Sequence, residues 1–141
     1  MSAFWDASAV VPLCVPAQRS KIAIRLVRAD VPVIWWGTPL EVQSALARLR
    51  SEGELSFNAY DAAKKRMVSL AEGWRQIQPT TLVRELAMAQ LDRFSLRAGD
   101  ALQLGAALVW VKQKPRGRMF ITNDTRLAAA ASAVGFDAQG V

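Results

Sequence analysis

Short apolar runs alternate with longer stretches of helical periodicity along the whole chain, and this alternation limits the possible folds more than any other feature. Five short runs, each bounded by turn-forming or charged residues, favour β-strands. We expect these strands at residues 3–5, 31–36, 75–78, 118–122 and 135–138. A chain that alternates strands with helices forms a mostly parallel sheet that is covered by helices on both faces.

The longer stretches between these runs have apolar residues at spacings of three and four, which is typical of amphipathic helices. We expect helices at residues 21–28, 40–50, 58–73, 80–94, 99–114 and 124–134, and a turn after the first strand. No internal repeat and no linker rich in proline, serine or glycine interrupts the pattern. Residues 1–141 are therefore predicted to form a single α/β domain.

The composition excludes several kinds of chemistry. The 141 residues include no histidine and one cysteine, Cys14. Mechanisms that need an imidazole to move a proton are therefore excluded, and a single thiol makes neither an intramolecular disulfide nor a thiolate zinc site. Catalysis by this chain would depend on carboxylates, hydroxyls, lysine or arginine, and a bound metal would be a hard cation with oxygen ligands.

The charge of the chain favours polyanionic partners. Lys and Arg number 18 against 12 Asp and Glu, giving a formal net charge of +6, and thirteen of the basic residues are arginine. Arginine pairs well with phosphates, although the same charge also serves plain solubility. The longest nearly apolar stretch, residues 101–111, is far too short to span a membrane, and the N-terminus lacks the features of a secretory signal. We expect a cytoplasmic protein with no membrane association.

Four of the twelve acidic residues stand where a predicted strand meets a predicted helix or where a helix opens: Asp6, Glu41, Asp100 and Asp124. The other eight fall at helix ends, on polar helix faces, beside arginines or near the C-terminus. Each of the four also has a local explanation. Glu41 would complete a capping box with Thr38, Asp124 would cap its helix, and Asp100 would interact favourably with the helix dipole. Asp6 follows a buried strand, so it needs a partner to offset desolvation.

The topology weakens these separate explanations. In a parallel sheet, the junctions that follow the strands lie along one edge of the molecule, where ligands bind. Four carboxylates gathered there would repel one another unless they took up protons or bound a divalent cation. Mg²⁺ or Mn²⁺ would satisfy them, and such a cation polarises a phosphoryl oxygen and activates water for phosphodiester hydrolysis.

The same residues carry a family resemblance. Four features resemble, in their order, the four acidic motifs of PIN domains: Asp6-Ala7-Ser8, Glu41, Leu96-Arg97-Ala98-Gly99-Asp100-Ala101-Leu102-Gln103-Leu104 and Thr122-Asn123-Asp124-Thr125-Arg126-Leu127. The resemblance covers the whole chain and is strongest to the VapC-type toxins of toxin-antitoxin pairs. In one departure, Ala7 stands where many members have Thr or Ser.

The resemblance implies a PIN-like fold, a three-layer α/β/α sandwich around a mostly parallel sheet of about five strands. It implies an endoribonuclease that depends on Mg²⁺ or Mn²⁺, with Asp6, Glu41, Asp100 and Asp124 as metal ligands. Ser8 and Thr122 would place hydroxyls near the metal, with Asn123 beside them. The expected partners are an RNA substrate, a small cognate antitoxin and a second copy of the chain in a homodimer. Arg97 and Arg126 are candidates to hold the RNA phosphates that flank the cleaved bond.

Other functions remain open on the sequence alone. A nucleic-acid or protein-binding module could keep this fold without using a metal. A stand-alone RNA-processing nuclease, a DNA nuclease or a metal-dependent phosphatase would use the same cation chemistry on related phosphate esters.

Overall fold

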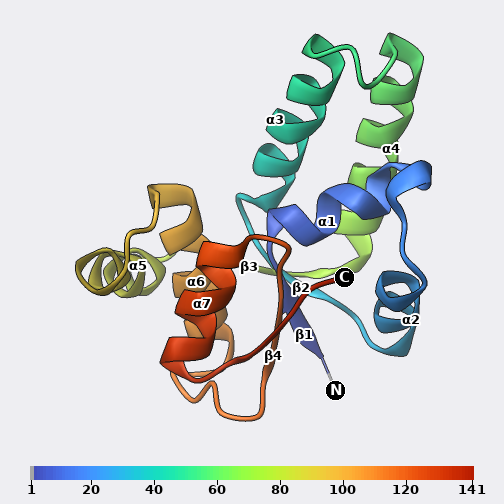
Figure 1. The fold of residues 1–141 in the computed structure, drawn as a ribbon. Coiled ribbons are helices and arrows are strands. Elements are labelled where there is room, and N and C mark those ends of the chain that lie inside the picture. The colour runs from blue at the N-terminus through green and yellow to red at the C-terminus, as the bar shows by residue number, and fades with distance from the viewer. Residues whose placement is uncertain (1) are drawn as a thin grey trace.

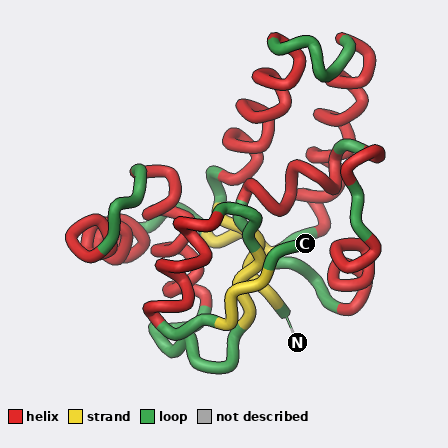
Figure 2. Tube along the Cα trace, in the orientation of Figure 1, coloured by secondary structure: helices red, strands yellow, loops and turns green. Residues whose placement is uncertain are grey.

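The computed structural model describes residues 2–141, and its centre is one five-stranded sheet in which every strand pairing is parallel. The strand order is β3-β2-β1-β4-β5, so the first strand lies in the middle of the sheet. Figures 1 and 2 show the strands at the centre of the fold with helices around them. The strands are β1 (Ala3–Trp5), β2 (Val33–Trp35), β3 (Arg75–Ile77), β4 (Met119–Ile121) and β5 (Asp137–Gln139). Each is three residues long, so the helices that pack on the sheet supply most of the buried apolar surface.

Helices cover both faces of the sheet. One face packs against α1 (Ala7–Cys14), α2 (Lys21–Ala29), α3 (Thr38–Ser51) and α4 (Phe57–Gly73). The other face packs against α5 (Thr81–Arg93), α6 (Ala98–Trp110) and α7 (Thr125–Val134). A short 3₁₀ turn, Pro16–Gln18, joins α1 to α2. Figure 1 shows α3 and α4 side by side as a hairpin that projects from the rest of the molecule.

The alternation of side chains along β1 divides the core in two. Ala3 and Trp5 face the side of α1 to α4, and Phe4 faces the side of α5 to α7. Phe4 is fully buried and stacks on Phe120 of β4 with ring centroids 5.2 Å apart. Since neighbouring residues of a strand point to opposite faces, this one tripeptide contributes to both hydrophobic layers. The expected three-layer α/β/α sandwich around about five parallel strands is confirmed.

The predicted elements are present, with boundaries that differ by a few residues, but the sequence reading missed one helix. The segment after the first strand was expected to be a turn, whereas it forms α1. Val10, Val11 and Pro12 disfavour a helix locally, since β-branched residues lose side-chain freedom and proline removes a backbone donor. The Asp6 cap and the burial of Ala9, Val10, Leu13 and Cys14 outweigh these local preferences. None of the helices in the described part of the chain is long and apolar enough to span a membrane.

The contact between α5 and α6 depends on a glycine. A Cβ atom added at Gly105 would lie 2.7 Å from the carbonyl oxygen of Val83 and 2.9 Å from the backbone nitrogen of Ala87. Real Cβ atoms do not approach backbone atoms this closely, so the two helices can pack at this distance only because residue 105 lacks a side chain. This contact fixes α6, the helix that carries Asp100.

Gly105→Ala is expected to destabilise the protein by about 1–3 kcal/mol, because the added methyl group forces α5 and α6 apart. An alanine in a helix interior is otherwise more favourable than a glycine, so the expected sign is opposite to the ordinary one. Chemical denaturation measures the change, and Gly73→Ala, where an added Cβ meets nothing within 4 Å, is the control. Equal stability of the two variants would contradict the close packing.

Candidate functional site

Asp6 lies at the carboxyl end of β1, in the middle of the sheet. Its backbone N–H donates to the carbonyl oxygen of Ile121 at 3.1 Å, which continues the pairing of β1 with β4 by one residue. Thr122 therefore lies beside Asp6, and both side chains are buried, with 4% and 2% of their surface exposed. The strand register thus joins the first and last of the predicted motifs.

Ser8 connects these two motifs. Its hydroxyl donates to Asp6 Oδ1 at 2.8 Å, lies 3.2 Å from Thr122 Oγ1 and accepts the backbone N–H of Asn123 at 2.8 Å. Asp6 also caps α1, since its Oδ2 accepts the backbone N–H of Ser8. This arrangement satisfies a helix N-terminus and at the same time fixes the Asp6 carboxylate.

A proline inside α1 explains a further contact between the motifs. Pro12 has no N–H, so the carbonyl oxygen of Ser8, four residues earlier, has no helical donor. That oxygen accepts a hydrogen bond from Asn123 Nδ2 at 3.4 Å, and Asn123 Oδ1 accepts the N–H of Val141 at 2.9 Å. The break in the α1 ladder therefore ties the β4–α7 loop and the chain end to the first motif.

Asp124 caps α7, as one of the local explanations predicted. Its Oδ1 accepts the backbone N–H groups of Arg126 and Leu127 at 2.9 and 3.0 Å. The N–H of Asp124 donates to Thr122 Oγ1 at 3.0 Å, which holds the loop. The hydrogen bonds found for this side chain all involve Oδ1, and the residue is half-buried at the edge of a cleft. Capping and ligand binding are compatible here, because the two oxygens of one carboxylate can have different partners.

The predicted capping box of α3 is wrong. Gly37 is the N-cap, without a side-chain bond, and Thr38 is already the first helical residue. The Thr38 hydroxyl instead pairs with the amide of Gln103 on α6, with Nε2 to Oγ1 at 3.1 Å. Glu41 is therefore not used in a cap, and its carboxylate lies against Gly99, where an added Cβ would be 3.7 Å from Oε1.

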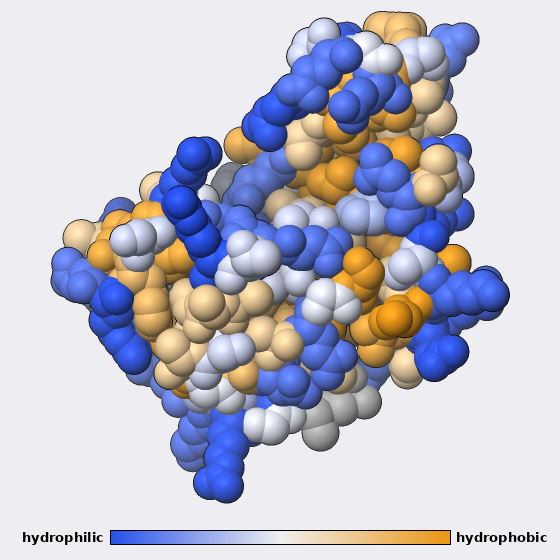
Figure 3. All heavy atoms as spheres, viewed as in Figure 1, coloured by the Kyte–Doolittle hydropathy of each residue, from blue (hydrophilic) through white to orange (hydrophobic). Residues whose placement is uncertain are grey.

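An open cleft of about 690 Å³ brings most of the predicted site residues together. It lies between the starts of α3, α6 and α7, and Figure 3 shows hydrophilic residues bordering the notch between the α3–α4 hairpin and the α5–α7 side. Six of the nine residues singled out from the sequence line it: Glu41, Arg97, Asp100, Asn123, Asp124 and Arg126. The other three, Asp6, Ser8 and Thr122, form the hydrogen-bonded layer joined to the cleft through Asn123 and Asp124.

Burial and mutual repulsion disfavour the charged forms of these carboxylates. Burial raises the pKa of Asp6 to about 6, with the hydrogen bonds from Ser8 and Thr122 opposing the shift and the charge of Asp124 adding to it. Burial raises the pKa of Glu41 to about 7, the Gln103 amide opposes this, and the charges of Asp6 and Asp100 add to it.

Asp100 completes a closed set of repulsions. Burial and the charge of Asp124 raise its pKa, while Arg97 and Arg126 lower it. Asp6 thus interacts with Asp124, Asp124 with Asp100, Asp100 with Glu41, and Glu41 with Asp6. The four acids form one electrostatic group, although they are far apart in sequence.

The chemistry of this donor set fits a hard divalent cation. Among residues 2–141, none of the four carboxylates forms an ion pair with a lysine or arginine. A cation in the cleft would offset both the desolvation and the repulsion, and carboxylate oxygens are the ligands that Mg²⁺ and Mn²⁺ prefer. In the same part of the chain, no three acidic or thiol side chains already converge to ligand distances, so binding would require the carboxylates to rotate toward the ion.

Sequence reasoning missed Gln103 and Gly99. Gln103 is fully buried and lies three residues after Asp100 on α6, where it reaches Thr38. The sequence does mark Gln103 as unusual, since it is the lone polar residue between Ala101 and Val111. A buried amide requires partners, but the sequence does not say which ones. Gly99 gives no comparable signal, because its role is to leave space beside Glu41.

Three solved structures share the fold. A chain of a toxin-antitoxin complex from Klebsiella pneumoniae aligns with a TM-score of 0.60 at 16% identity, over 90% of each chain. PAE2754 from Pyrobaculum aerophilum aligns with a TM-score of 0.65 at 19% identity, over 100% of this chain and 90% of that one. FitAcB from Neisseria gonorrhoeae aligns with a TM-score of 0.65 at 15% identity, over 97% of each chain.

In each comparison the alignment covers at least 90% of this chain and of the other chain, so the similarity concerns the complete fold. No family model and no curated protein sequence matches the chain. The expected PIN-like fold is confirmed by these structures, and at such low identity the likeness concerns fold alone.

The stability of the protein should depend on pH through Asp6. Because the pKa of this carboxyl is higher in the folded than in the unfolded chain, the folded state binds more protons between about pH 4 and pH 6, and stability falls as pH rises through that range. Asp6→Asn removes this loss. In metal-free buffer we expect the variant to be more stable than the wild type by roughly 3 kcal/mol at pH 8, with the gain disappearing near pH 4.

Denaturation curves at both pH values test this expectation. The control is Asp61→Asn, which removes a carboxylate from the surface of α4 where it pairs with Lys65. A difference between Asp6→Asn and wild type that is independent of pH, or of opposite sign at pH 8, would contradict the assigned burial of the charge.

Proposed function

We propose that this chain is a metal-dependent endoribonuclease of the PIN-domain type and acts as the toxin of a toxin-antitoxin pair. The observation that carries the proposal is the cleft of about 690 Å³ lined by Glu41, Asp100 and Asp124, with Asp6 in the layer behind it. Helix capping would explain a single carboxylate at the start of one helix. It does not explain why four carboxylates that repel one another lie together at this edge of the sheet.

Some residues of the site would bind the metal ion, and others hold these ligands in place. Asp100, Asp124 and Asp6, with Glu41 directly or through water, would hold one or two Mg²⁺ or Mn²⁺ ions. When bound, the cation supplies positive charge to a phosphoryl oxygen and activates water for attack on phosphorus. Ser8 and Thr122 hold Asp6 in place, and Gln103 and Gly99 shape the surroundings of Glu41.

Two arginines of the cleft support a phosphodiester substrate. Arg97 and Arg126 line the cleft beside the acids, and both lower the pKa of Asp100 through their charges. A guanidinium group binds a phosphate with two parallel hydrogen bonds, so these residues would hold the phosphates that flank the bond to be cut. The net charge of +6 would favour the approach of a polyanion.

The proposed partners follow from the resemblance and from the neighbours in fold. One neighbour comes from a toxin-antitoxin complex, which supports a small antitoxin as the partner of this chain. We further propose a homodimer and a cytoplasmic location, as in the family that the sequence resembles.

Asp100→Asn is expected to reduce cleavage of a single-stranded oligoribonucleotide in Mg²⁺ or Mn²⁺ by at least about 100-fold, because it removes a charge from the metal site. The matched control, Asp61→Asn, removes one charge from α4 and should cleave at the wild-type rate. Chelation of the metal should abolish cleavage by the wild-type protein and by Asp61→Asn. Normal cleavage by a folded Asp100→Asn variant would refute the assigned site.

The same assay separates the rival functions if a DNA of the same sequence and a simple phosphomonoester are included. Cleavage of DNA or of the monoester without cleavage of RNA would replace the proposed substrate. A complete lack of hydrolysis in Mn²⁺ would favour a binding module.

Mn²⁺ should stabilise the wild-type protein against heat. At about 100 times its dissociation constant, an ion that binds only the folded state adds about 2.7 kcal/mol to the free energy of unfolding. The increase in melting temperature should be lost in Asp100→Asn and retained in Asp61→Asn. An equal shift in all three proteins would place the ion elsewhere.

A further inference from the structure

The loop between α6 and β4 is strongly basic and lies away from the carboxylate cleft. Residues 112–118 include four cations and no acidic residue: Lys112, Lys114, Arg116 and Arg118. We call this segment the α6–β4 basic loop. Figure 1 shows it in orange, at the end of the molecule opposite the α3–α4 hairpin, and Figure 3 shows hydrophilic side chains projecting from the same end. The loop therefore presents a concentrated positive charge to the solvent.

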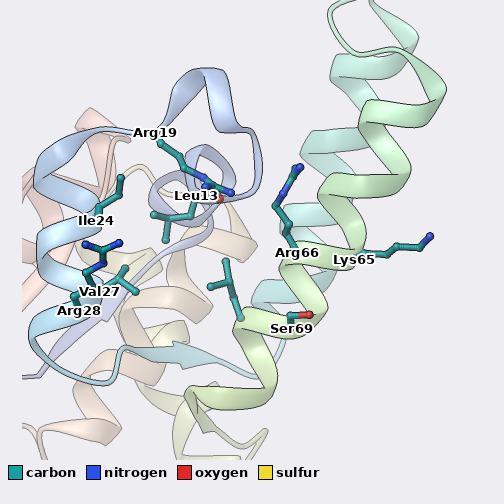
Figure 4. Close-up of a pocket in the computed structure, with 9 residues that line it drawn as sticks. Leu13, Arg19, Ile24, Val27, Arg28, Lys65, Arg66 and Ser69 are labelled. Atoms are coloured by element: carbon teal, nitrogen blue, oxygen red, sulfur yellow. Dashed lines mark hydrogen bonds between the residues drawn. The ribbon is translucent and has the colours of Figure 1, made fainter.

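The cations of the basic loop lack the protein partners that other basic residues have. Within residues 2–141, none of the four forms an ion pair or donates a side-chain hydrogen bond. By contrast, Arg19 and Arg66, beside the hollow between α1, α2 and α4, donate to carbonyl oxygens at the end of α1 (Figure 4). Lys65 of α4 pairs with Asp61. The charge of the basic loop is thus available to a partner from outside the chain.

The backbone that carries these cations is fixed. Lys112 and Gln113 both have positive φ, 53° and 59°, a conformation that is uncommon for residues other than glycine. The N–H of Gln113 donates to the carbonyl oxygen of Leu108 at 2.8 Å, which holds this turn to the end of α6. Pro115 lies against the end of α7, since an added Cβ at Gly135 would be 3.1 Å from Pro115 Cγ. A fixed backbone lowers the entropy that binding costs.

Arg118 has a defined position at the base of the loop. Its guanidinium carbon lies 4.5 Å from the centre of the Trp110 ring. Its Nε is buried and has no hydrogen-bond partner in the part of the chain that the structure describes. A guanidinium group over an aromatic face keeps its N–H donors in its own plane, where they can bind a phosphate. Arg118 therefore retains unused donors beside the three exposed cations.

Two helices connect the basic loop to the carboxylate cleft. Helices α6 and α7 pack against each other, begin at the cleft and end at the loop. An α-helix rises about 1.5 Å per residue, so Lys112 lies about 18 Å along α6 from Asp100. Stacked nucleotides lie about 3.4 Å apart along a strand, so this distance corresponds to about five nucleotides. Between Asp124 and Asp137 the chain has no acidic residue, so α7 adds no negative charge between the two sites.

We propose that the α6–β4 basic loop is a second contact for the phosphates of an RNA whose cleaved bond lies in the carboxylate cleft. The identity of this polyanion rests on the proposed nuclease function. A docked protein would need apolar anchors, and residues 112–118 contain no large apolar side chain. A phosphate backbone needs only charge. The loop would add affinity for longer RNA without reading its bases.

Equilibrium binding of oligouridylates to the full chain tests the proposal. Asp100→Asn is the parent protein, so that the probes are not cut, and fluorescence anisotropy measures the binding of a twelve-nucleotide and a four-nucleotide probe at several salt concentrations. The loop variant adds Lys114→Gln and Arg116→Gln, both at exposed positions. The matched control adds Arg25→Gln and Arg28→Gln instead, which removes the same charge from exposed positions on α2.

We expect the loop variant to bind the twelve-nucleotide probe about tenfold more weakly than its parent at low salt, because two phosphate contacts are lost. Each lost contact with a single strand lowers the salt dependence of log K by about 0.7, so the slope should fall by about 1.4. The four-nucleotide probe is too short to reach from the cleft to the loop, so its affinity should not change. The control should bind both probes like its parent, and melting curves check that each variant is folded.

Three results would overturn the proposal. Equal weakening by the loop variant and the control would show diffuse charge attraction. Equal weakening of both probes would show that the loop does not act together with the cleft. An effect of the loop variant on binding of a glutamate-rich peptide, with none on RNA, would assign the surface to an acidic protein.

The two proposals fail separately. Cleavage of RNA by the wild-type protein, together with unchanged RNA binding by the loop variant, would refute the second contact alone. A lack of cleavage, together with weaker binding of the longer probe alone by the loop variant, would refute the nuclease function and leave the loop as an RNA contact.

Discussion

The central constraint on this structure is the repulsion among four carboxylates that the fold gathers at one edge of the sheet. Asp6, Glu41, Asp100 and Asp124 come from segments spread over most of the chain, yet each raised pKa among them includes the charge of another member of the group. No ion pair within residues 2–141 neutralises them. A fold maintains such an arrangement at a cost in stability, and a divalent cation would convert that cost into binding energy.

A small number of short elements brings these acids together. The strands are three residues long, and their parallel arrangement places the ends of β1, β2 and β4 at the same edge. Helix α1 makes polar contacts at both of its ends: Asp6 and Ser8 hold the carboxylate layer at its start, and the carbonyls of Leu13 and Cys14 hold two arginines at its end.

The sequence predicted the architecture and the grouping of the acids because both follow from the alternation of strands and helices. A parallel topology brings the junctions that follow β1, β2 and β4 to one edge without any knowledge of contacts. The sequence could not predict α1, because Val11 and Pro12 disfavour a helix locally and tertiary packing decides the outcome. Nor could it predict the pairing of Thr38 with Gln103, because the local rule that favours a capping box says nothing of a partner 65 residues away.

Anomalous diffraction from crystals soaked in Mn²⁺ would test the central claim most directly, since it locates the ion independently of catalysis. We predict a manganese peak within coordination distance of Asp100, Asp124 and at least one of Asp6 and Glu41, with these carboxylates rotated toward it. A fully soaked crystal with no peak in this cleft, or with manganese bound only at other carboxylates, would contradict the account.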